Sequence, residues 1–374
     1  MTPAETSYGD YLDRMPKAEL HCHLTGTVRA ETFAELSARA GVELPADPLD
    51  IYRRINSKAP SATAYRNTRL PVPDGPAPDE PDPSYSLFEV SNWVKRSLTR
   101  LEDFQRIAYE ALADARQRSN TRHLELFIDP VTPQDWSFSY AQIVDAYIDG
   151  MRAAEKDFGI SSLLIAGIDR SKSGADAVAV VQQLIDDRRD EVVGIGLDNL
   201  ETAGPPERFV QAYELARSAG LRRTAHSSEH APTAVNTITC LDQLHCDRID
   251  HGYFILEDDA VVERCRAEGI PFTCIFTTSR RSWRPWRRAS IAEMVARGIT
   301  VTLSSDDPGM FPTTLAAEYR IAGLELGLSR EQMRKICLDG VAASWLDDTA
   351  KAALHQQFVA ELDALEKELF PQSG

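Results

Sequence analysis

Short apolar runs rich in β-branched residues alternate along the chain with longer amphipathic segments. The longer segments, among them 140–157, 175–190 and 205–219, repeat apolar residues every three or four positions and are predicted to be helices. The short runs are predicted to be eight strands, at 17–24, 123–129, 161–168, 192–199, 222–229, 248–253, 272–277 and 300–307.

This alternation predicts an α/β fold. Strands that alternate with helices pair in parallel, and eight of them close most economically into a (β/α)8 TIM barrel. The alternative, an open doubly wound sheet, would place a glycine-rich phosphate-binding turn after an early strand. The sequence contains no such turn, so we expect the barrel.

Two regions depart from the alternation. Residues 25–120 are far longer than one crossover helix, so they predict a helical insertion with a strong helix over about 86–118. The stretch 328–370 is rich in Leu, Ala and Glu and predicts helices that close a single domain over 1–374. Part of the insertion is proline-rich and predicts an extended connector, or flap, that contains Pro71, Pro73, Pro76, Pro78, Pro81 and Pro83.

Composition narrows the class of protein. The 374 residues are 43% hydrophobic, which suits one large core, and 57 acidic against 41 basic residues give a net charge of −16 that would repel a nucleic-acid backbone. No apolar run reaches the roughly 20 residues that span a bilayer, and the N-terminus has no signal-peptide core. Six cysteines without a CxxC pair indicate reduced thiols. We expect a cytoplasmic protein that acts on a small molecule, and its oligomeric state stays open.

Metal-type residues gather at the carboxyl ends of the predicted strands, where barrel active sites lie. His21 and His23 are two apart, so strand alternation points both imidazoles to the same side. The ends of the fifth, sixth and eighth strands add His226, His251 and the pair Asp306–Asp307. Imidazole nitrogen combined with carboxylate oxygen suits zinc.

The remaining histidines are expected to be less important. His123 begins a strand, and His245 and His355 lie in helical stretches, so a structural role is expected for these three. His230 is nearer to the site but less well placed.

Glu229 follows His226 by three residues, and on an unbroken strand the two would face opposite sides. They can converge only if the strand breaks after His226, which would place Ser227 and Ser228 in a turn. A carboxylate there could move a proton between an activated water and a leaving group.

Taken together, these motifs resemble the adenosine deaminase family of the amidohydrolase superfamily. The similarity runs in order through PKAELHCHLTGT (16–27), HLELFIDP (123–130), VVGIGL (192–197), TAHSSE (224–229), DRIDHGY (247–253) and TLSSDDPGMF (302–311). The resemblance implies an enzyme with a TIM-barrel fold that removes an amino group from a purine by hydrolysis. It also implies one zinc ion per chain, bound by His21, His23, His226 and Asp306.

The resemblance assigns further roles to three residues. Glu229 would protonate the purine ring at N1, His251 would orient and deprotonate the attacking water, and Asp307 would hydrogen-bond N7. No lysine occurs from 173 through 334, so the lysine-bridged two-metal site of other amidohydrolases is not expected.

Several positions depart from the family pattern and bear on the substrate. Thr25 stands where an acidic residue usually holds a ribose hydroxyl, and Asn199 stands in the place of a glycine that presents a backbone amide to the purine. The usual HAGE is HSSE, which resembles the branch that deaminates N6-methyl-AMP, and Asp250 replaces a common glycine. Plain adenosine is therefore in question as the substrate.

The arginine-rich stretch SRRSWRPWRR (279–288) leaves two interpretations open. Arg280 and Arg281 could bind the phosphate of a substrate, or they could belong to an exposed helix start whose arginines pair with surface acids.

The sequence thus predicts a zinc hydrolase that removes the 6-amino or alkylamino group of an adenine-containing nucleoside or related purine. The alternatives are an N6-substituted AMP or another anionic purine, a different aminated heterocycle such as a free base, and a relative that has lost catalysis.

Overall fold

The structure is a computed structural model that describes residues 3–55, 84–129, 138–278 and 284–371. Eight parallel strands follow one another around a single sheet in chain order. They are β1 (Lys17–His23), β2 (Thr121–Ile128), β3 (Ser161–Asp169), β4 (Val192–Asp198), β5 (Arg222–Ser227), β6 (Ile249–His251), β7 (Pro271–Cys274) and β8 (Thr300–Leu303).

The sheet closes where the chain beyond β8 meets β1. The N–H of His23 donates to the carbonyl oxygen of Asp306 at 2.7 Å, and the N–H of Asp306 donates to the carbonyl oxygen of His21 at 3.1 Å. The predicted (β/α)8 barrel is therefore confirmed.

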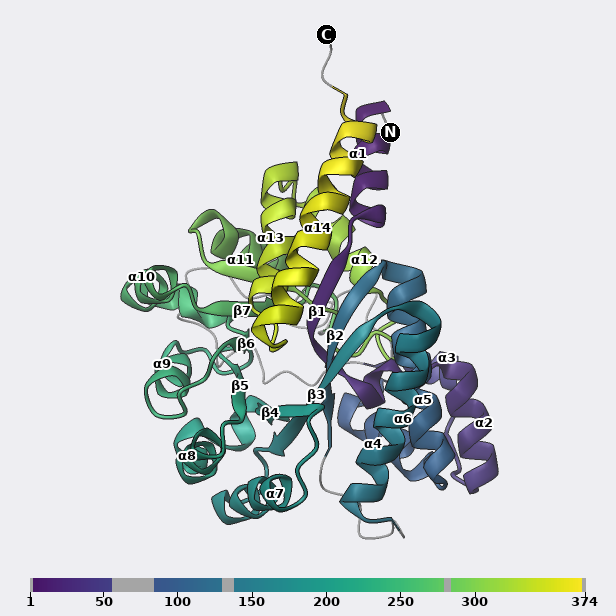
Figure 1. Cartoon of the computed structure of the whole chain (residues 1–374). Helices are drawn as coiled ribbons and strands as arrows, with labels where there is room; N and C mark the ends of the chain where they lie inside the picture. The colour runs from purple at the N-terminus through teal and green to yellow at the C-terminus, as the bar shows by residue number, and fades with distance from the viewer. Residues whose placement is uncertain (1–2, 56–83, 130–137, 279–283, 372–374) are drawn as a thin grey trace.

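Helices follow the strands and cover the outside of the barrel (Figure 1). Helix α6 confirms the predicted helix 140–157. The hydroxyl of Ser139, directly before the helix, accepts the N–H of Gln142, and the helix ends before Gly159, which has a φ of 64°. The covering helices are α6 (Tyr140–Phe158), α7 (Gly174–Asp186), α8 (Val210–Ser218), α9 (Val235–Asp242), α10 (Asp259–Glu268) and α11 (Arg284–Ala296).

The insertion between β1 and β2 differs from the prediction in one respect. The prediction of a single helix over about 86–118 is wrong. The first helix ends before Leu98, whose φ of −83° and ψ of 97° are those of extended backbone. The carboxylate of Asp103 then accepts the N–H groups of Thr99 and Arg100, which starts a new helix. The insertion comprises η1 (Leu24–Thr27), α2 (Ala30–Ala40), α3 (Pro48–Arg53), α4 (Leu87–Ser97) and α5 (Leu101–Ser119). The proline-rich stretch 71–83 lies outside the described residues.

The end of the chain folds back on its beginning. Helix α1 (Pro3–Arg14) lies beside α14 (Asp348–Leu369) (Figure 1), where Arg14 pairs with Glu368 at 2.7 Å. The predicted helical stretch 328–370 contains α13 (Arg330–Ala342) and α14, preceded by α12 (Leu315–Arg320) and η7 (Ile321–Glu325). Within the described residues, no helix has both the length and the apolarity to cross a membrane.

A buried ion pair ties several strands together at the amino end of β6. The guanidinium of Arg248 contacts Glu125 of β2 and donates to the carbonyl oxygen of Leu20 at 2.8 Å. It also stacks over the ring of Trp345 at 3.9 Å. Both charged side chains are fully buried, so neither can exchange its partner for water.

We expect Arg248→Met to lower the free energy of unfolding by about 3–5 kcal/mol, because Glu125 is left buried without its counter-charge. Urea unfolding monitored by circular dichroism measures this. The double variant Arg248→Met/Glu125→Gln should lose less than the single variant. A single variant as stable as the unmodified protein would contradict the role of the pair.

Candidate active site

Three imidazoles and one carboxylate meet at the carboxyl end of the barrel. One ligand atom from each of His21, His23, His226 and Asp306 lies within 4.8 Å of the others. Nε2 of His226 is 3.1 Å from Nε2 of His21 and 3.3 Å from Nε2 of His23. Oδ1 of Asp306 is 3.5 Å from Nε2 of His21 and 3.2 Å from Nε2 of His23.

This cluster fits a zinc ion. Ligands at about 2.0–2.1 Å around a tetrahedral zinc stand roughly 3.3–3.4 Å from one another, and the spacings of 3.1–3.5 Å agree with that edge. Neutral imidazole nitrogens aimed at each other repel unless a proton or a cation lies between them. The donor set and its spacing therefore match a single metal ion.

A second layer of polar groups stands behind the histidines. Asp250 lies between the Nδ1 atoms of His21 and His226, at 3.6 and 3.5 Å. Its two oxygens accept the hydroxyls of Thr273 at 2.8 Å and Thr224 at 2.9 Å. Asp250 is fully buried beneath the site, so this departure from the family pattern supports the histidines rather than shaping the substrate pocket.

Asp198 takes a similar position on the other side of the cluster. It ends β4, and its carboxylate is 3.6 Å from Nδ1 of His23. Burial alone would raise the pKa of Asp198, but the nearby His23 and His226 hold it below its usual value. Asp198 was not among the predicted site residues, although its place at the end of a predicted strand was a usable signal.

The chain breaks after His226 and turns Glu229 into the site. β5 ends at Ser227 rather than at 229, and Ser228 adopts φ 51° in the left-handed region. The turn is held by the buried carboxylate of Glu201, which lies in η3 (Glu201–Ala203). Glu201 accepts the backbone N–H groups of Ser228, Glu229, His230 and Ala231 at 2.7–2.9 Å. No sequence pattern indicated this anchor.

The carboxylate of Glu229 is surrounded by cationic or basic groups. Its Oε1 is 2.9 Å from Nη2 of Arg287, and its Oε2 is 2.9 Å from Nδ1 of His230 and 3.5 Å from Nε2 of His251. Burial alone would raise the pKa of Glu229, but its basic neighbours, His230 first and then Arg287, hold it well below the usual range. His230 therefore lies closer to the reacting groups than the sequence indicated.

His251 and Asp307 complete the group of expected acid–base residues. Burial, with the neighbouring imidazoles of His21 and His226, holds the pKa of His251 well below its usual value, so this ring is a neutral proton acceptor. Nδ1 of His251 lies 3.2 Å from the hydroxyl of Tyr253. Burial and the adjacent Asp306 raise the pKa of Asp307.

A small pocket of about 130 Å³ opens beside the cluster. Among the expected substrate-binding residues, Thr25, Asn199 and Asp307 line it. Helix α4 forms one wall, from which Lys95 reaches Asp129 at 2.8 Å. Lys95 was not among the predicted site residues, because a lysine on the polar side of a helix carries no distinguishing pattern. Arg280 and Arg281 lie outside the described residues.

Asn199 adopts a backbone conformation that favours glycine. Its φ is 74°, in the left-handed region that asparagine tolerates better than most residues. Its side chain accepts the N–H of Leu200 at 2.7 Å and donates to Asp169 at 3.0 Å, while its own N–H donates to Asp198. Both amides of this turn are thus already bonded to side chains, which changes how the turn can contact a purine.

His123 lies away from these groups, as expected. It is fully buried, with Nδ1 2.8 Å from the hydroxyl of Ser161 and Nε2 3.3 Å from Glu125. Its environment is that of a structural histidine.

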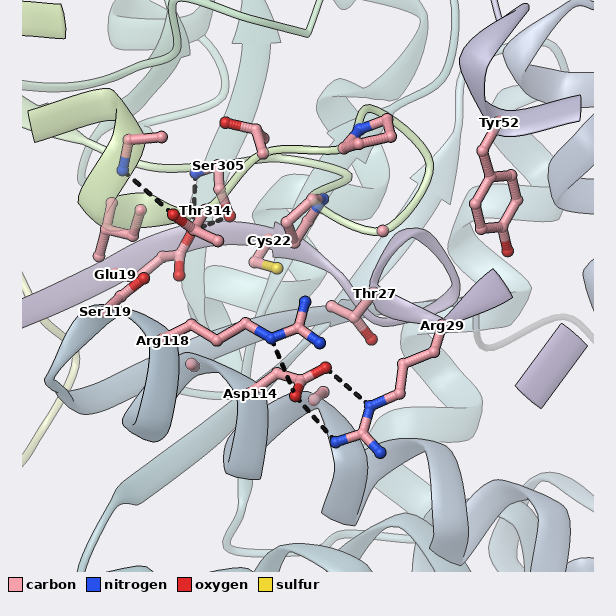
Figure 2. Close-up of a pocket in the computed structure, with 18 of the residues that line it drawn as sticks. Glu19, Cys22, Thr27, Arg29, Tyr52, Asp114, Arg118, Ser119, Ser305 and Thr314 are labelled. Atoms are coloured by element: carbon pink, nitrogen blue, oxygen red, sulfur yellow. Dashed lines mark hydrogen bonds and ion pairs between the residues drawn. The ribbon is translucent and has the colours of Figure 1, made fainter. Parts of the chain in front are cut away.

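A larger cavity of about 470 Å³ lies outside the barrel wall, between β1, α5 and the start of α12 (Figure 2). None of the expected site residues that the structure describes lines it. Arg29 and Arg118 at its mouth both pair with Asp114, and Glu19 at its base accepts from Ser305. Its principal charged groups are thus already paired, whereas the expected acid–base residues Glu229, His251 and Asp307 line the smaller pocket.

Comparison with known proteins agrees with this geometry. Residues 82–361 match the model of the adenosine deaminase family. An adenine deaminase from Streptomyces coelicolor is 31% identical over 357 residues, which cover 95% of this chain and 97% of that protein.

Two solved structures extend the comparison. An amidohydrolase from Burkholderia ambifaria, solved with bound zinc, is 32% identical with a TM-score of 0.85, covering 97% of this chain and 94% of the other. An adenine deaminase from Arthrobacter aurescens is 28% identical with a TM-score of 0.77, covering 93% and 99%.

We expect Glu201→Gln to destabilise the turn that carries Glu229, because its amide group cannot accept from all the N–H groups that Glu201 now satisfies. The free energy of unfolding should fall by roughly 2–4 kcal/mol, since buried N–H groups lose their acceptor. Urea unfolding measures this change. Hydrogen exchange at 228–231 should also accelerate, and unchanged exchange there would contradict the anchoring role.

Asp250→Ala is expected to weaken zinc binding by about 10–100-fold, because both histidines lose the carboxylate behind them. Competition with a chromogenic zinc chelator measures the affinity. Asp247→Ala is the matched control, since Asp247 pairs with Arg222 and Arg223 instead. Equal zinc affinity in the two variants would rule out this role for Asp250.

Proposed function

The chain belongs to the adenosine deaminase family of hydrolytic deaminases acting on purines, and from this premise we propose that it is a zinc-dependent enzyme for an uncharged 6-aminopurine. Free adenine is the proposed substrate, with 6-oxopurine and ammonia as products. The observation that carries the proposal is the zinc-compatible cluster, next to Glu229 and within a small, acidic pocket.

The metal would be held by His21, His23, His226 and Asp306, the four groups of that cluster. Bound there, zinc would make water nucleophilic at neutral pH and stabilise the charge that develops on oxygen. Asp250 and Asp198 would keep the histidine rings in the orientation that binds the metal.

The side chains around the cluster divide the remaining chemistry. His251, as a neutral imidazole, would orient the attacking water and accept its proton. Glu229 would deliver a proton to N1 of the ring, so that negative charge does not build up there as C6 is attacked. Asp307 would hydrogen-bond N7 and fix the ring in the pocket.

The charge of the pocket supports an uncharged substrate. Its described lining contains one lysine and no arginine, and that lysine, Lys95, is paired with Asp129. The same lining contains five acidic residues: Asp129, Asp198, Glu229, Asp306 and Asp307. Asp306 would bind the metal and the pKa of Asp307 is raised, which leaves Asp129, Asp198 and Glu229 as negative charges on the wall. A nucleotide phosphate, with a charge of about −1.5 to −2, would be repelled by such a wall.

The size of the pocket points in the same direction. Its volume of about 130 Å³ is well below the roughly 300–1,000 Å³ of sites that hold drug-sized molecules. A bare purine needs less space than a nucleoside. The relative from Streptomyces coelicolor is itself an adenine deaminase and aligns over nearly the whole chain, which supports the same choice. The expected nucleoside and N6-substituted AMP are thus less favoured than the free base.

Ammonia release from adenine, adenosine, AMP and N6-methyl-AMP tests the proposal. We expect adenine to have the highest kcat/KM and the two nucleotides to react at least about 100-fold more slowly, which corresponds to about 2.7 kcal/mol of transition-state stabilisation.

Two controls accompany this assay. Glu229→Gln should lose about 10²–10⁴-fold in kcat because it cannot transfer the ring proton. Dialysis against a chelator should abolish turnover, and added zinc should restore it. A preference for AMP would overturn the choice of substrate, and no ammonia from any of the four would overturn the purine assignment.

A further inference from the structure

Arg287 is a buried arginine that contacts Glu229, one of the expected acid–base residues, from behind. It lies in the first turn of α11 and is fully buried. Its Nη2 donates to Oε1 of Glu229 at 2.9 Å, and its Nη1 donates to the carbonyl oxygen of Thr278. Its guanidinium stands 4.8 Å from the ring centre of Tyr253, whose hydroxyl is 3.2 Å from Nδ1 of His251.

This placement is unfavourable for Arg287 unless it has a partner of opposite charge. The first turn of a helix favours negative charge, and removing a guanidinium from water costs several kcal/mol without a counter-ion. Glu229 is the acid paired with Arg287 among the described residues. Because arginine keeps its proton at any pH at which proteins fold, the buried pair requires Glu229 to be ionised.

An ionised Glu229 has no proton to give. A residue that protonates a substrate from the resting state normally has a raised pKa, set by an apolar environment. Here His230 and the permanently charged Arg287, both 2.9 Å from the carboxylate, oppose that, and together with the other basic neighbours they hold the pKa of Glu229 well below its usual range despite burial. The proton for the ring must therefore reach Glu229 after the substrate binds.

We propose that Arg287 is a positioning residue that keeps Glu229 as a carboxylate between turnovers, so that the proton Glu229 gives to N1 comes from the attacking water. This inference rests on the proposed purine deaminase function. It adds the origin of the proton and the residue that enforces it.

The proton balance is complete without another reactant. As the water oxygen bonds to C6, one O–H bond breaks, and the proton passes to Glu229 by way of Nε2 of His251, which is 3.5 Å from Oε2 of Glu229. Glu229 then transfers this proton to N1 and is a carboxylate again. The second proton of the water goes to the departing nitrogen as its bond to C6 breaks, and ammonia leaves.

Several other charged or titratable groups face Glu229 and share control of its protonation. They come from every element around it: Glu201 of η3, His230 of the same turn, His251 of β6, Tyr253 of η5 (Tyr253–Glu257), Arg287 of α11, and Asp306 and Asp307 beyond β8. Arg287 is the member of this set whose positive charge does not change with pH, so its removal isolates one contribution.

The test compares zinc-loaded Arg287→Gln, Arg287→Lys and the unmodified protein. The pH dependence of kcat/KM for adenine is measured from about pH 5 to about pH 9. In Arg287→Gln, the pH at which activity is half lost on the acid side should rise by about one unit or more, because an adjacent cation lowers a carboxyl pKa by about 1–3 units. Arg287→Lys, which keeps the charge, should stay within about half a unit of the unmodified protein.

Arg288→Gln is the matched control, because the neighbouring Arg288 points to Glu325 on the outside. It should leave the profile unchanged. An equal loss of activity at all pH values in Arg287→Gln, or a gain at neutral pH, would overturn the proposal. If Arg287→Gln does not fold, the pH profile of Arg287→Lys tests the proposal. A rise of one unit or more in the pH at which this variant loses half of its activity on the acid side would overturn the proposal.

Infrared difference spectra against Glu229→Gln give a readout that does not need turnover. At neutral pH the unmodified protein should show a carboxylate band from Glu229, whereas Arg287→Gln should show a protonated carboxyl band on mild acidification. A protonated band in the unmodified protein at neutral pH would overturn the proposal. Failure to deaminate adenine would instead count against the proposed function, and the spectra would still decide the role of Arg287.

Discussion

Closure of the barrel at Asp306 is the constraint on which the rest of the site depends. The backbone of Asp306 bonds to β1 on both sides, through the carbonyl oxygen of His21 and the N–H of His23. The same residue aims its carboxylate at these two imidazoles. Asp306 adopts φ 61°, a left-handed conformation that most side chains avoid. The hydrogen bonds that complete the sheet therefore also assemble the cluster that could hold a metal.

The cluster is held from below as well as from within. Asp250 joins the histidines of β1 and β5 through one buried carboxylate, and threonine hydroxyls of β5 and β7 fix that carboxylate in turn. Glu201 does the same for the turn after β5 by accepting a run of backbone N–H groups. Such support matters because a metal or a reacting ring tolerates little misplacement of the groups that bind it.

The electrostatics of the pocket connect substrate choice with mechanism. Carboxylates dominate its lining, and the cation on α4 is paired with Asp129, so the wall favours a neutral ligand. Behind the wall, Arg287 offsets part of this negative charge at Glu229, the carboxylate proposed to transfer a proton. In this arrangement a single buried arginine can govern the protonation of Glu229 without touching the substrate.

The sequence by itself determined the barrel, because the periodicity of apolar residues is a local property that can be recognised without knowledge of the fold. It also predicted the zinc-compatible set, since the spacing of His21 and His23 and the histidines and aspartates at strand ends repeat a recognisable pattern. The helix break at Leu98 was missed, because the capping by Asp103 competes with an uninterrupted helical pattern.

Only the tertiary structure decided how Glu229 is held. Its partners Glu201 and Arg287 lie 28 and 58 positions away in the chain. Glu201 stands in no motif, and the arginine-rich stretch 279–288 that contains Arg287 did not indicate a contact with Glu229. The sequence predicted that Asp250 alters the substrate pocket, yet Asp250 lies behind His21 and His226 of the zinc-compatible cluster. Protonation and support depend on distances through space between residues far apart in the chain, and a linear pattern does not contain these distances.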